Sequence, residues 1–225
     1  MKHTIITIML ALVAITGWGQ EIKRVTATAE DFMEHMKMYG YEVFSFDISS
    51  LRDSVSSFTL FIREYDNKGM INEESIAELN TRSMISCFPE EDQKEIYSTK
   101  DADDLEHGIY RFSKILSIGF SPVQSDSIEY FTIRTSSLNS LKGKLIQKPI
   151  PGLSEPTYSY RAVPYRPSAF SIGKFTPLVL YCSSWSDGEI YRCCGDDEMT
   201  EEKEKDSNYF QYSPHYYILG AVFHK

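Results

Sequence analysis

The sequence predicts an α+β domain, built mainly from antiparallel β-sheet in a sandwich-like arrangement, with one or two helices near its N-terminus. Fifteen Tyr and thirteen Phe in 225 residues are typical of sheets rather than helical bundles. From residue 95 onward, alternating apolar and polar residues follow the period of half-buried strands. No flexible linker interrupts the chain, so residues 20–225 are expected to form a single domain, with a division near residue 100 left open.

The expected helices both lie before residue 95. One is predicted over residues 29–38 and a second over 73–84, where Asn72 can cap the first turn and Ile76 and Leu79 would face inward. Strands are predicted near residues 44–48, 58–62, 95–99, 109–120, 127–135, 143–148, 158–163, 175–183, 189–194 and 215–223.

The first nineteen residues have the pattern of a cleavable export signal. Lys2 precedes an apolar run from Ile5 to Ile15, and Gly17-Trp18-Gly19 then supplies the small residues of a cleavage site, which places cleavage after Gly19. Eleven residues rise only about 16 Å as a helix, whereas a membrane span needs roughly 20 apolar residues. We therefore expect residues 1–19 to be removed and no transmembrane segment to remain. The product would work in the periplasm, on the outer-membrane surface or as a secreted protein.

The charge balance limits the expected partners. The chain has 23 basic and 32 acidic residues, a net charge of −9, and loss of Lys2 with the signal would make it −10. Because nucleic acids and anionic membranes are themselves negative, neither is an expected partner. No cofactor motif is present, and none is expected. The acidic run over residues 101–107 fails as an EF-hand because Glu106 stands where glycine is needed and Phe112 where glutamate is needed, so no metal site is predicted.

Four cysteines follow the expected cleavage point, at positions 87, 182, 193 and 194. In an oxidising compartment they could form disulfides. Asp187-Gly188 is the strongest two-residue hairpin signal in the chain, and a tight turn there would place Cys182 opposite Cys193. Directly opposed residues lie within disulfide range, so this register would allow a Cys182–Cys193 bridge, although the pair would be the wider, hydrogen-bonded kind.

The same hairpin is the best candidate for a binding surface. A tight turn at Asp187-Gly188 would put Trp185 opposite Ile190, with Arg192 on the same face. An aromatic platform flanked by polar groups suits a sugar ring or a protein contact. Trp185, Asp187 and Arg192 are therefore the predicted binding residues, and the alternative is that Trp185 only covers a sheet.

Catalytic residues are harder to identify. The chain contains no G-x-S-x-G, no H-E-x-x-H and no glycine-rich phosphate loop. Glu106 and His107, at the end of the acidic run, are the best candidates if carboxylates converge only in the folded chain. The alternative for both is a solvated loop leading into a strand.

Three segments resemble a family of uncharacterised exported proteins from Bacteroides and related gut bacteria. They are the stretch from Asp47-Ile48 to Glu64-Tyr65, the stretch from Cys87-Phe88-Pro89 to Glu95, and the strand Phe175–Tyr181 with Pro214–Tyr217. The resemblance implies a source and a compartment but no activity. In such exported proteins Asp-Ser-aliphatic triplets accept O-glycans, which implies glycosylation at Ser54 and Ser127.

Two functional hypotheses follow from the sequence. The first is an exported, non-enzymatic binding or interaction module whose partner is a glycan or a protein. The second is a secreted hydrolase whose carboxylates come together only in three dimensions. A deep pocket holding two acids of perturbed pKa would favour the hydrolase, and an exposed aromatic face would favour the binding module.

Overall fold

The structure is a computed structural model that describes residues 26, 28–122, 127–135, 138–166, 171–186, 190–193, 195–206 and 209–225. The expected signal peptide, residues 1–19, lies outside the described residues. Residues 36–225 form one compact unit, and the part before residue 36 is a separate unit. Within the described residues, no helix is long and apolar enough to cross a membrane.

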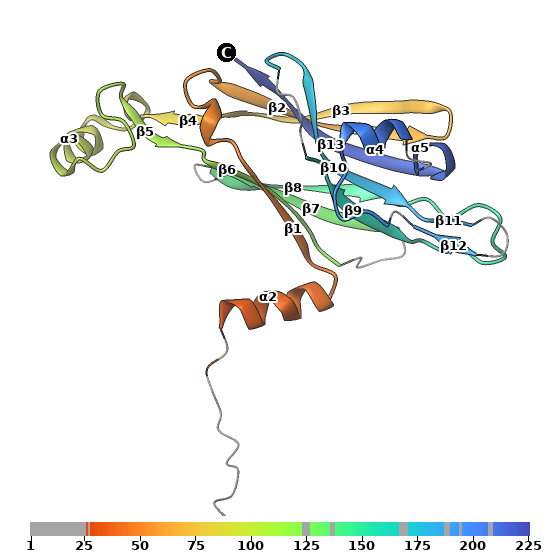
Figure 1. Ribbon diagram of the computed structural model, residues 1–225. Coiled ribbons are helices and arrows are strands. Elements are labelled where there is room, and N and C mark those ends of the chain that lie inside the picture. The colour runs from red at the N-terminus through yellow and green to blue at the C-terminus, as the bar shows by residue number, and fades with distance from the viewer. Residues whose placement is uncertain are drawn as a thin grey trace, which may run out of the picture. The chain divides into compact units, whose positions relative to one another are not determined.

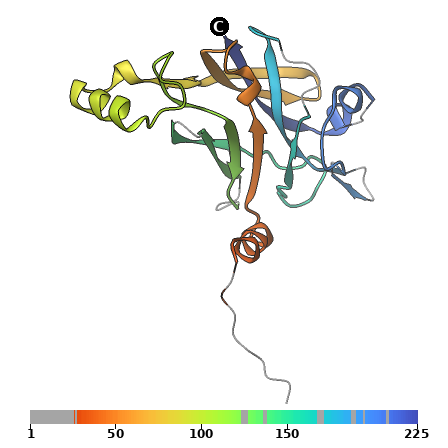
Figure 2. The same cartoon turned by 60° about the vertical axis from the view of Figure 1, so that its left-hand side comes forward.

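The described part of the compact unit contains two large antiparallel sheets and two two-stranded ones, and the large sheets are seen in Figures 1 and 2; this confirms the predicted β-rich α+β fold. The four-stranded sheet has the order β1-β6-β7-β8, and its strands are Glu42–Asp47, Ile115–Phe120, Ile128–Thr135 and Leu138–Ile146. The five-stranded sheet has the order β3-β2-β13-β10-β9, and its strands are Gly69–Asn80, Ser57–Asp66, His215–His224, Phe175–Ser183 and Tyr160–Pro164.

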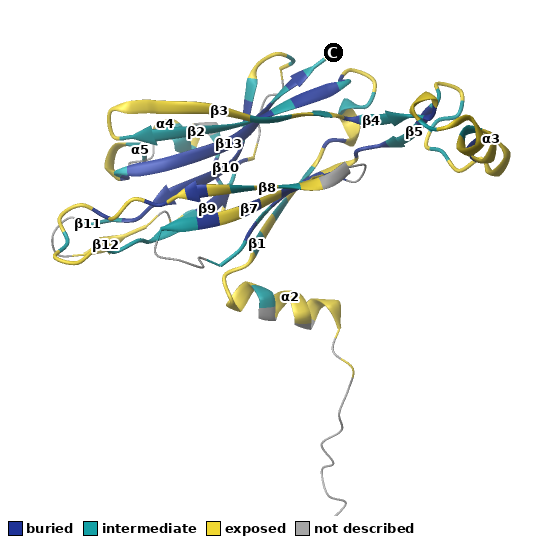
Figure 3. Cartoon of the chain, turned by 180° about the vertical axis from the view of Figure 1, so that it is seen from behind, coloured by how far each residue is buried: buried dark blue, intermediate teal, exposed yellow. Residues whose placement is uncertain are grey.

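The main core lies between the two sheets. The four-stranded sheet contributes buried residues such as Leu116, Phe131 and Ile133, and the five-stranded sheet contributes Leu60 and Leu219. Buried residues alternate with exposed ones along β7, so this strand covers the core with one face and meets solvent with the other (Figure 3). This is the pattern that half-buried strands require.

The five-stranded sheet also buries part of its other face. Here Leu180, Cys182 and Ile218 pack with Met199, which precedes helix α4 (Glu201–Asp206). Helix α5 (Tyr209–Tyr212) adds Phe210, whose ring meets the Tyr216 ring edge-on at 5.0 Å. The central strands β10 and β13 are therefore buried on both faces.

The predicted helix over residues 73–84 is wrong, because this segment forms most of strand β3. It pairs along its length with β2, and a bulge shifts the register so that Ala77 faces Leu60 and Ser75 faces Phe61. Ile76 and Leu79 both pack against the core. Two residues three apart face opposite sides of a regular strand, and the extra residue in the bulge brings them to the same side. This three-residue spacing imitated a helix.

The predicted strand over residues 95–99 is also wrong, because helix α3 spans Glu90–Thr99. Pro89 precedes it, and three acidic residues occupy its first turn, where the positive end of the helix dipole favours them. The acidic run therefore begins a helix instead of ending one. Lys100, with a φ of 55°, terminates it.

The segment 109–120, predicted as one strand, divides into two. Strand β5 (Ile109–Phe112) pairs with β4 (Arg82–Met84), and β6 begins at Ile115 in the four-stranded sheet. Short 3₁₀ turns occupy Ser49–Leu51 and Ile85–Cys87. The remaining helix, α2, spans Ala29–Met38 as predicted.

The hairpin after β10 has a different register from the predicted one. Strands β11 (Trp185–Ser186) and β12 (Tyr191–Arg192) pair so that Trp185 faces Arg192 rather than Ile190. The connection therefore spans residues 187–190, which is longer than a two-residue turn.

The predicted Cys182–Cys193 disulfide is not formed, and both residues are thiols. Cys182 lies inside β10 with Tyr216 of β13 on one side and Arg161 of β9 on the other. Because both edges of β10 are occupied there, no strand carrying Cys193 can pair beside it. Cys182 is buried and Cys193 is exposed.

Candidate functional site

Polar side chains replace apolar ones at one end of the four-stranded sheet, on its core-facing side. In β1, Glu42 lies on the same face as Phe44 and Phe46, at the end of the strand. In β7, Glu129 lies on the same face as Phe131 and Ile133, again at the end of the strand. The ladder extends one step beyond β8, since the Gln147 N–H donates to the Ser127 carbonyl. Buried Gln147 thus lies at the same end of the sheet as Glu129 and Glu42.

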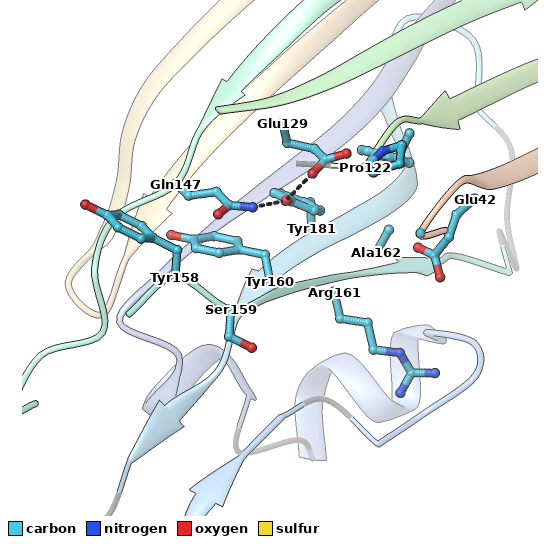
Figure 4. A pocket seen from close by; sticks show the side chains of 12 residues that line it. Glu42, Pro122, Glu129, Gln147, Tyr158, Ser159, Tyr160, Arg161, Ala162 and Tyr181 are labelled. Atoms are coloured by element: carbon cyan, nitrogen blue, oxygen red, sulfur yellow. Dashed lines mark hydrogen bonds between the residues drawn. The ribbon is translucent and has the colours of Figure 1, made fainter. Parts of the chain in front are cut away.

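These polar groups line a pocket of about 590 Å³ between the two sheets. Its other wall comes from β9, the two residues before it and β10 of the five-stranded sheet, which contribute Tyr158 to Ala162 and Tyr181. The volume is within the range of small-molecule sites. Figure 4 shows Glu129 and Gln147 converging on the Tyr181 hydroxyl, whereas Glu42 lies apart from this group.

The Tyr181 hydroxyl connects the two sheets. It accepts a hydrogen bond from Gln147 Nε2 at 2.5 Å and donates one to Glu129 Oε2 at 3.2 Å. All three residues are buried. A buried polar group is costly without a partner, and here each member supplies a partner for the next.

The pocket contains two carboxyl groups of raised pKa. Burial raises the pKa of Glu129 to about 7, and the nearby Glu42 carboxylate adds to this effect against the hydrogen bond from Tyr181. Burial also raises the pKa of Glu42, and the positive charge of Arg161 opposes it. Near neutral pH, Glu129 is therefore divided between a form that accepts and a form that donates hydrogen bonds.

Aromatic rings form the floor of the pocket. The Tyr181 ring is stacked between Phe120, at 5.5 Å between centroids, and Tyr160, at 5.1 Å. Tyr160 meets the His215 ring edge-on at 5.9 Å. Stacking on both faces restrains the Tyr181 ring as a whole, and this helps to keep its hydroxyl beside Gln147 and Glu129.

A second hydrogen-bonded chain lies behind the floor and joins Tyr160 to a carboxylate. His215 Nε2 is 2.8 Å from Glu64 Oε1, and His215 Nδ1 is 2.6 Å from the Tyr160 hydroxyl. A carboxylate only accepts, so Nε2 carries the proton and Nδ1 accepts from Tyr160. Lys148 Nζ donates to the same Glu64 oxygen at 2.7 Å.

The ionisation of this chain follows from its surroundings. Burial lowers the pKa of His215, more than the hydrogen bond to Glu64 raises it, so the imidazole is held neutral. Burial acts to raise the pKa of Glu64, but the hydrogen bonds from Lys148 and His215 and the charge of Lys148 outweigh it and lower the pKa. The chain is thus an ionised carboxylate, a neutral imidazole and a phenol in sequence.

Glu106 and His107, the catalytic candidates from the sequence, lie elsewhere. Both are exposed in the loop before β5, and neither lines the pocket. His107 Nδ1 is 3.0 Å from Asp104 Oδ2, and Asp104 also pairs with Arg52. The arrangement ties the loop to the turn that carries Arg52. Among the described residues, no group of three His, Cys, Asp or Glu side chains is arranged to hold a metal ion.

The predicted binding residues are only partly described. Trp185 and Arg192 lie opposite each other on β11 and β12, while Asp187 lies outside the described residues. Trp185 is half-buried, and its ring is stacked near Tyr212 at 6.4 Å between centroids. The structure thus brings Trp185 and Arg192 together on a short hairpin, and neither residue lines the pocket.

The two predicted glycosylation sites differ in accessibility. Ser54 is exposed in a turn and its hydroxyl donates to the Leu51 carbonyl at 3.3 Å. Ser127 is half-buried at the start of β7, and its carbonyl is engaged by Gln147. Ser54 is the more accessible acceptor of the two.

The pocket residues were missed in the sequence although a signal for one of them existed. In β7 the polar residues Thr132 and Arg134 alternate with the apolar residues Phe131 and Ile133. Glu129 lies on the same face of the strand as the apolar pair. A carboxylate in the core-facing phase of a strand is the kind of buried polar group that marks a site. The partners Tyr181 and Tyr160 carry no such signal, because tyrosines are frequent throughout the chain.

Comparisons with known proteins define the family but no activity. No curated protein matches the chain, and no solved structure matches it. The model of the domain of unknown function DUF5041 matches residues 11–225, so the chain belongs to the DUF5041 family.

Proposed function

We propose that the protein is an exported binding module whose ligand is a hydroxyl-rich small molecule, such as a sugar unit of a glycan, held in the pocket between the two sheets. The observation that carries the proposal is the cluster of inward-facing Glu42, Glu129 and Gln147 at one end of an otherwise apolar interior. A domain that needed only stability would gain more from apolar residues at these positions.

The chemistry of the pocket suits neutral hydroxyl groups. The Gln147 side-chain amide has both a hydrogen-bond donor and an acceptor. Glu129 can donate or accept a hydrogen bond near pH 7 because its pKa is about 7. Tyr158 and Tyr160 add aromatic edges and faces against which the C–H face of a sugar ring can pack. Ser159 and Arg161 line the pocket and are partly exposed, which gives a longer chain a route out.

Binding is tested by saturation-transfer NMR with a panel of neutral mono- and oligosaccharides. Glu129→Leu is expected to weaken binding by about tenfold or more, because it removes the carboxyl group from the pocket. Glu74→Gln, on exposed β3, is the matched control and should bind as the parent does. Equal binding by Glu129→Leu and the parent, with both folded, would exclude the pocket as the site.

The hairpin of Trp185, Asp187 and Arg192 stays the alternative binding surface, and one substitution separates it from the pocket. Trp185→Ala should leave saccharide binding unchanged if the pocket is the site. Loss of binding in this variant, with the near-ultraviolet circular dichroism of the remaining aromatic residues preserved, would move the site to the hairpin.

A hydrolase is the second candidate, and it is supported by the raised pKa of both Glu42 and Glu129 in one pocket. Glu129 would serve as the general acid and Glu42 as the base or nucleophile, the two roles that glycoside hydrolysis needs. Turnover of unactivated oligosaccharides, whose leaving oxygen must be protonated, should then fall above about pH 7 as Glu129 loses its proton. Glu129→Gln should abolish this turnover, and turnover that survives the substitution would rule out the assigned acid.

Export through the first nineteen residues is the remaining part of the proposal. The full chain, expressed in a bacterium with an outer membrane, should be recovered outside the cytoplasm with Gln20 as its first residue. Mass spectrometry of the intact protein measures this directly. A chain that retains Met1 and stays in the cytoplasm would exclude export.

A further inference from the structure

A second cavity, distinct from the pocket above, lies along the free edge of strand β1. It has a volume of about 650 Å³ and runs beside residues 43–47 of β1 and Ile48, which follows the strand. The opposite wall comes from the five-stranded sheet and the segment after it, including Leu178, Phe223 and Arg166. The groove therefore lies on the side where β1 ends one sheet and β9 ends the other.

The edge of β1 presents unpaired backbone groups to this groove. The Ile48 N–H donates to the Lys114 carbonyl, which makes this a hydrogen-bonded pair of the β1–β6 ladder. Such pairs alternate, so Phe46 and Phe44 also bond to β6, and Val43, Ser45 and Asp47 direct their N–H and C=O groups away from it. Among the described residues, none of these three outward groups has a backbone partner.

The floor of the groove is apolar and only partly covered. Phe44 and Phe46 point inward from β1 but remain half-exposed, whereas Leu178 and Phe223 beneath them are buried. An added strand beside β1 would direct every second side chain onto Phe44 and Phe46. Apolar side chains at those positions would complete the burial of the floor.

The spacing of the unpaired backbone groups along the edge of β1 indicates which kind of molecule the groove would bind. Unpaired N–H and C=O groups recur every second residue, about 6.6 Å apart, over a strand of six residues. An extended polypeptide carries the complementary groups at the same repeat, whereas a sugar chain does not. An added strand would also bring the four-stranded sheet to the five strands of its partner sheet.

Charge distinguishes a peptide from a second copy of this chain. Asp47, at the end of the edge, is exposed, and hydrogen bonds from Ser49 lower the pKa of its carboxyl group, so it is ionised. Two copies with a net charge of −9 each would repel one another. A basic side chain on the outward face of the added strand would instead pair with Asp47 across the strands.

We propose that the groove beside β1 binds an extended peptide in which basic and apolar residues alternate, and that the peptide adds to the sheet as a fifth strand. Its backbone pairs with Val43, Ser45 and Asp47, its apolar side chains cover Phe44 and Phe46, and a basic side chain lies beside Asp47.

The probe is a set of blocked hexapeptides in which lysine alternates with valine, isoleucine, leucine or phenylalanine, titrated into the ¹⁵N-labelled full chain and followed by NMR. The amide protons of Val43, Ser45 and Asp47 are expected to shift downfield as they gain hydrogen bonds. If no member of the set shifts these amides, the proposal is overturned.

Two matched comparisons sharpen the test. Ser45→Pro removes one outward N–H without removing a bond to β6 and should weaken binding by about tenfold, whereas Ser45→Ala should not. N-methylation of every second peptide residue should abolish binding when the methylated residues are those that bond to β1, and should spare it when they are the others. This comparison requires no change to the protein. Equal effects of the two methylation patterns would contradict strand addition.

The oligomeric state tests the competing occupant. Sedimentation of the chain without peptide should show a monomer. A dimer that Ser45→Pro dissociates would assign the β1 edge to a second copy and overturn the peptide proposal.

Discussion

The two faces of the five-stranded sheet bury tyrosines in opposite ways. On the inner face, the hydroxyls of Tyr181 and Tyr160 each have partners within 3.2 Å, supplied by Gln147, Glu129 and His215. On the outer face, the Tyr165 hydroxyl is buried with no hydrogen-bond partner among the described residues. The inner face therefore contains a hydrogen-bonded polar network, whereas the buried hydroxyl of the outer face is surrounded by apolar packing.

This contrast separates two ways of burying polar atoms. An isolated hydroxyl tolerated among Met199, Leu180 and Ile218 costs stability and serves no visible chemistry. A network in which each member satisfies the next is costly to disturb and is typical of binding or catalytic sites. Substitutions on the two faces should accordingly differ in size and in pH dependence.

The largest effect is expected for packing on the outer face. Met199 is fully buried, and its backbone bonds to Pro164 and Arg166 hold the segment before α4 against β9. Met199→Ala should reduce the free energy of unfolding by about 2–5 kcal/mol, because it leaves a cavity that this anchored segment cannot fill. Urea denaturation measures the loss. A change below about 1 kcal/mol would show that the outer cluster collapses readily.

Removal of the Tyr181 hydroxyl should lower the free energy of unfolding by less than Met199→Ala does. The loss should still exceed that expected from the volume of a single oxygen atom. Tyr181→Phe leaves buried Gln147 and Glu129 without their shared partner and should destabilise the protein by about 1–3 kcal/mol in urea denaturation at pH 6. The ring stack with Phe120 and Tyr160 is kept in this variant. An unchanged unfolding free energy would mean that water replaces the hydroxyl at no cost.

The ionisation of Glu129 should make the inner face sensitive to pH. Its pKa of about 7 is above the usual 4.5, so the folded state retains a proton that the unfolded chain loses. The stabilisation is full below pH 4.5 and is lost as the pH rises toward 7. Glu129→Gln should match the parent at pH 4.5 and be more stable than it at pH 8 by about 1–2 kcal/mol.

His215 has the opposite pH dependence, which is why the variant and the parent are compared at each pH. Its lowered pKa costs stability as the pH falls below about 6.5, where the unfolded chain takes up the proton first. That contribution is common to both proteins and cancels. A difference between Glu129→Gln and the parent that does not vary with pH would contradict the raised pKa.

The smallest effect is expected at the isolated hydroxyl of the outer face. Tyr165→Phe removes a buried group that has no partner, so the unfolding free energy should change by less than about 0.5 kcal/mol or rise slightly. Paired with Tyr181→Phe, it compares the same chemical change on the two faces. A loss as large as that of Tyr181→Phe would reveal a partner for Tyr165 and remove the contrast.

The sequence alone determined the fold class and most strands of the sandwich. Alternation along β1 and β7 reflects one buried face, and the continuous apolar runs of β10 and β13 reflect two, so both patterns can be recognised locally. The helix at 29–38 was likewise predicted from a local pattern. The family resemblance agrees with the DUF5041 match in one respect, since both point to a family of unknown function.

Only the tertiary structure decided the segments whose local pattern was ambiguous. Residues 73–84 have helix-forming residues at helical spacing, but pairing with β2 and a bulge make them a strand. The acidic residues after Pro89 favour a helix start only through their position at its N-terminus. In each case long-range pairing or position along a helix outweighed propensities of less than about 1 kcal/mol per residue.

The pocket between the two sheets was likewise decided only by the tertiary structure. Glu129, Gln147, Tyr181 and Tyr160 come from four segments separated by up to 52 residues, and their hydrogen bonds exist only where the ends of two sheets meet. Residue type along the chain marks Glu129 as a polar residue in an apolar phase and says nothing of its partners. The sequence determines which faces are buried, and the packing of those faces against each other determines which polar groups meet.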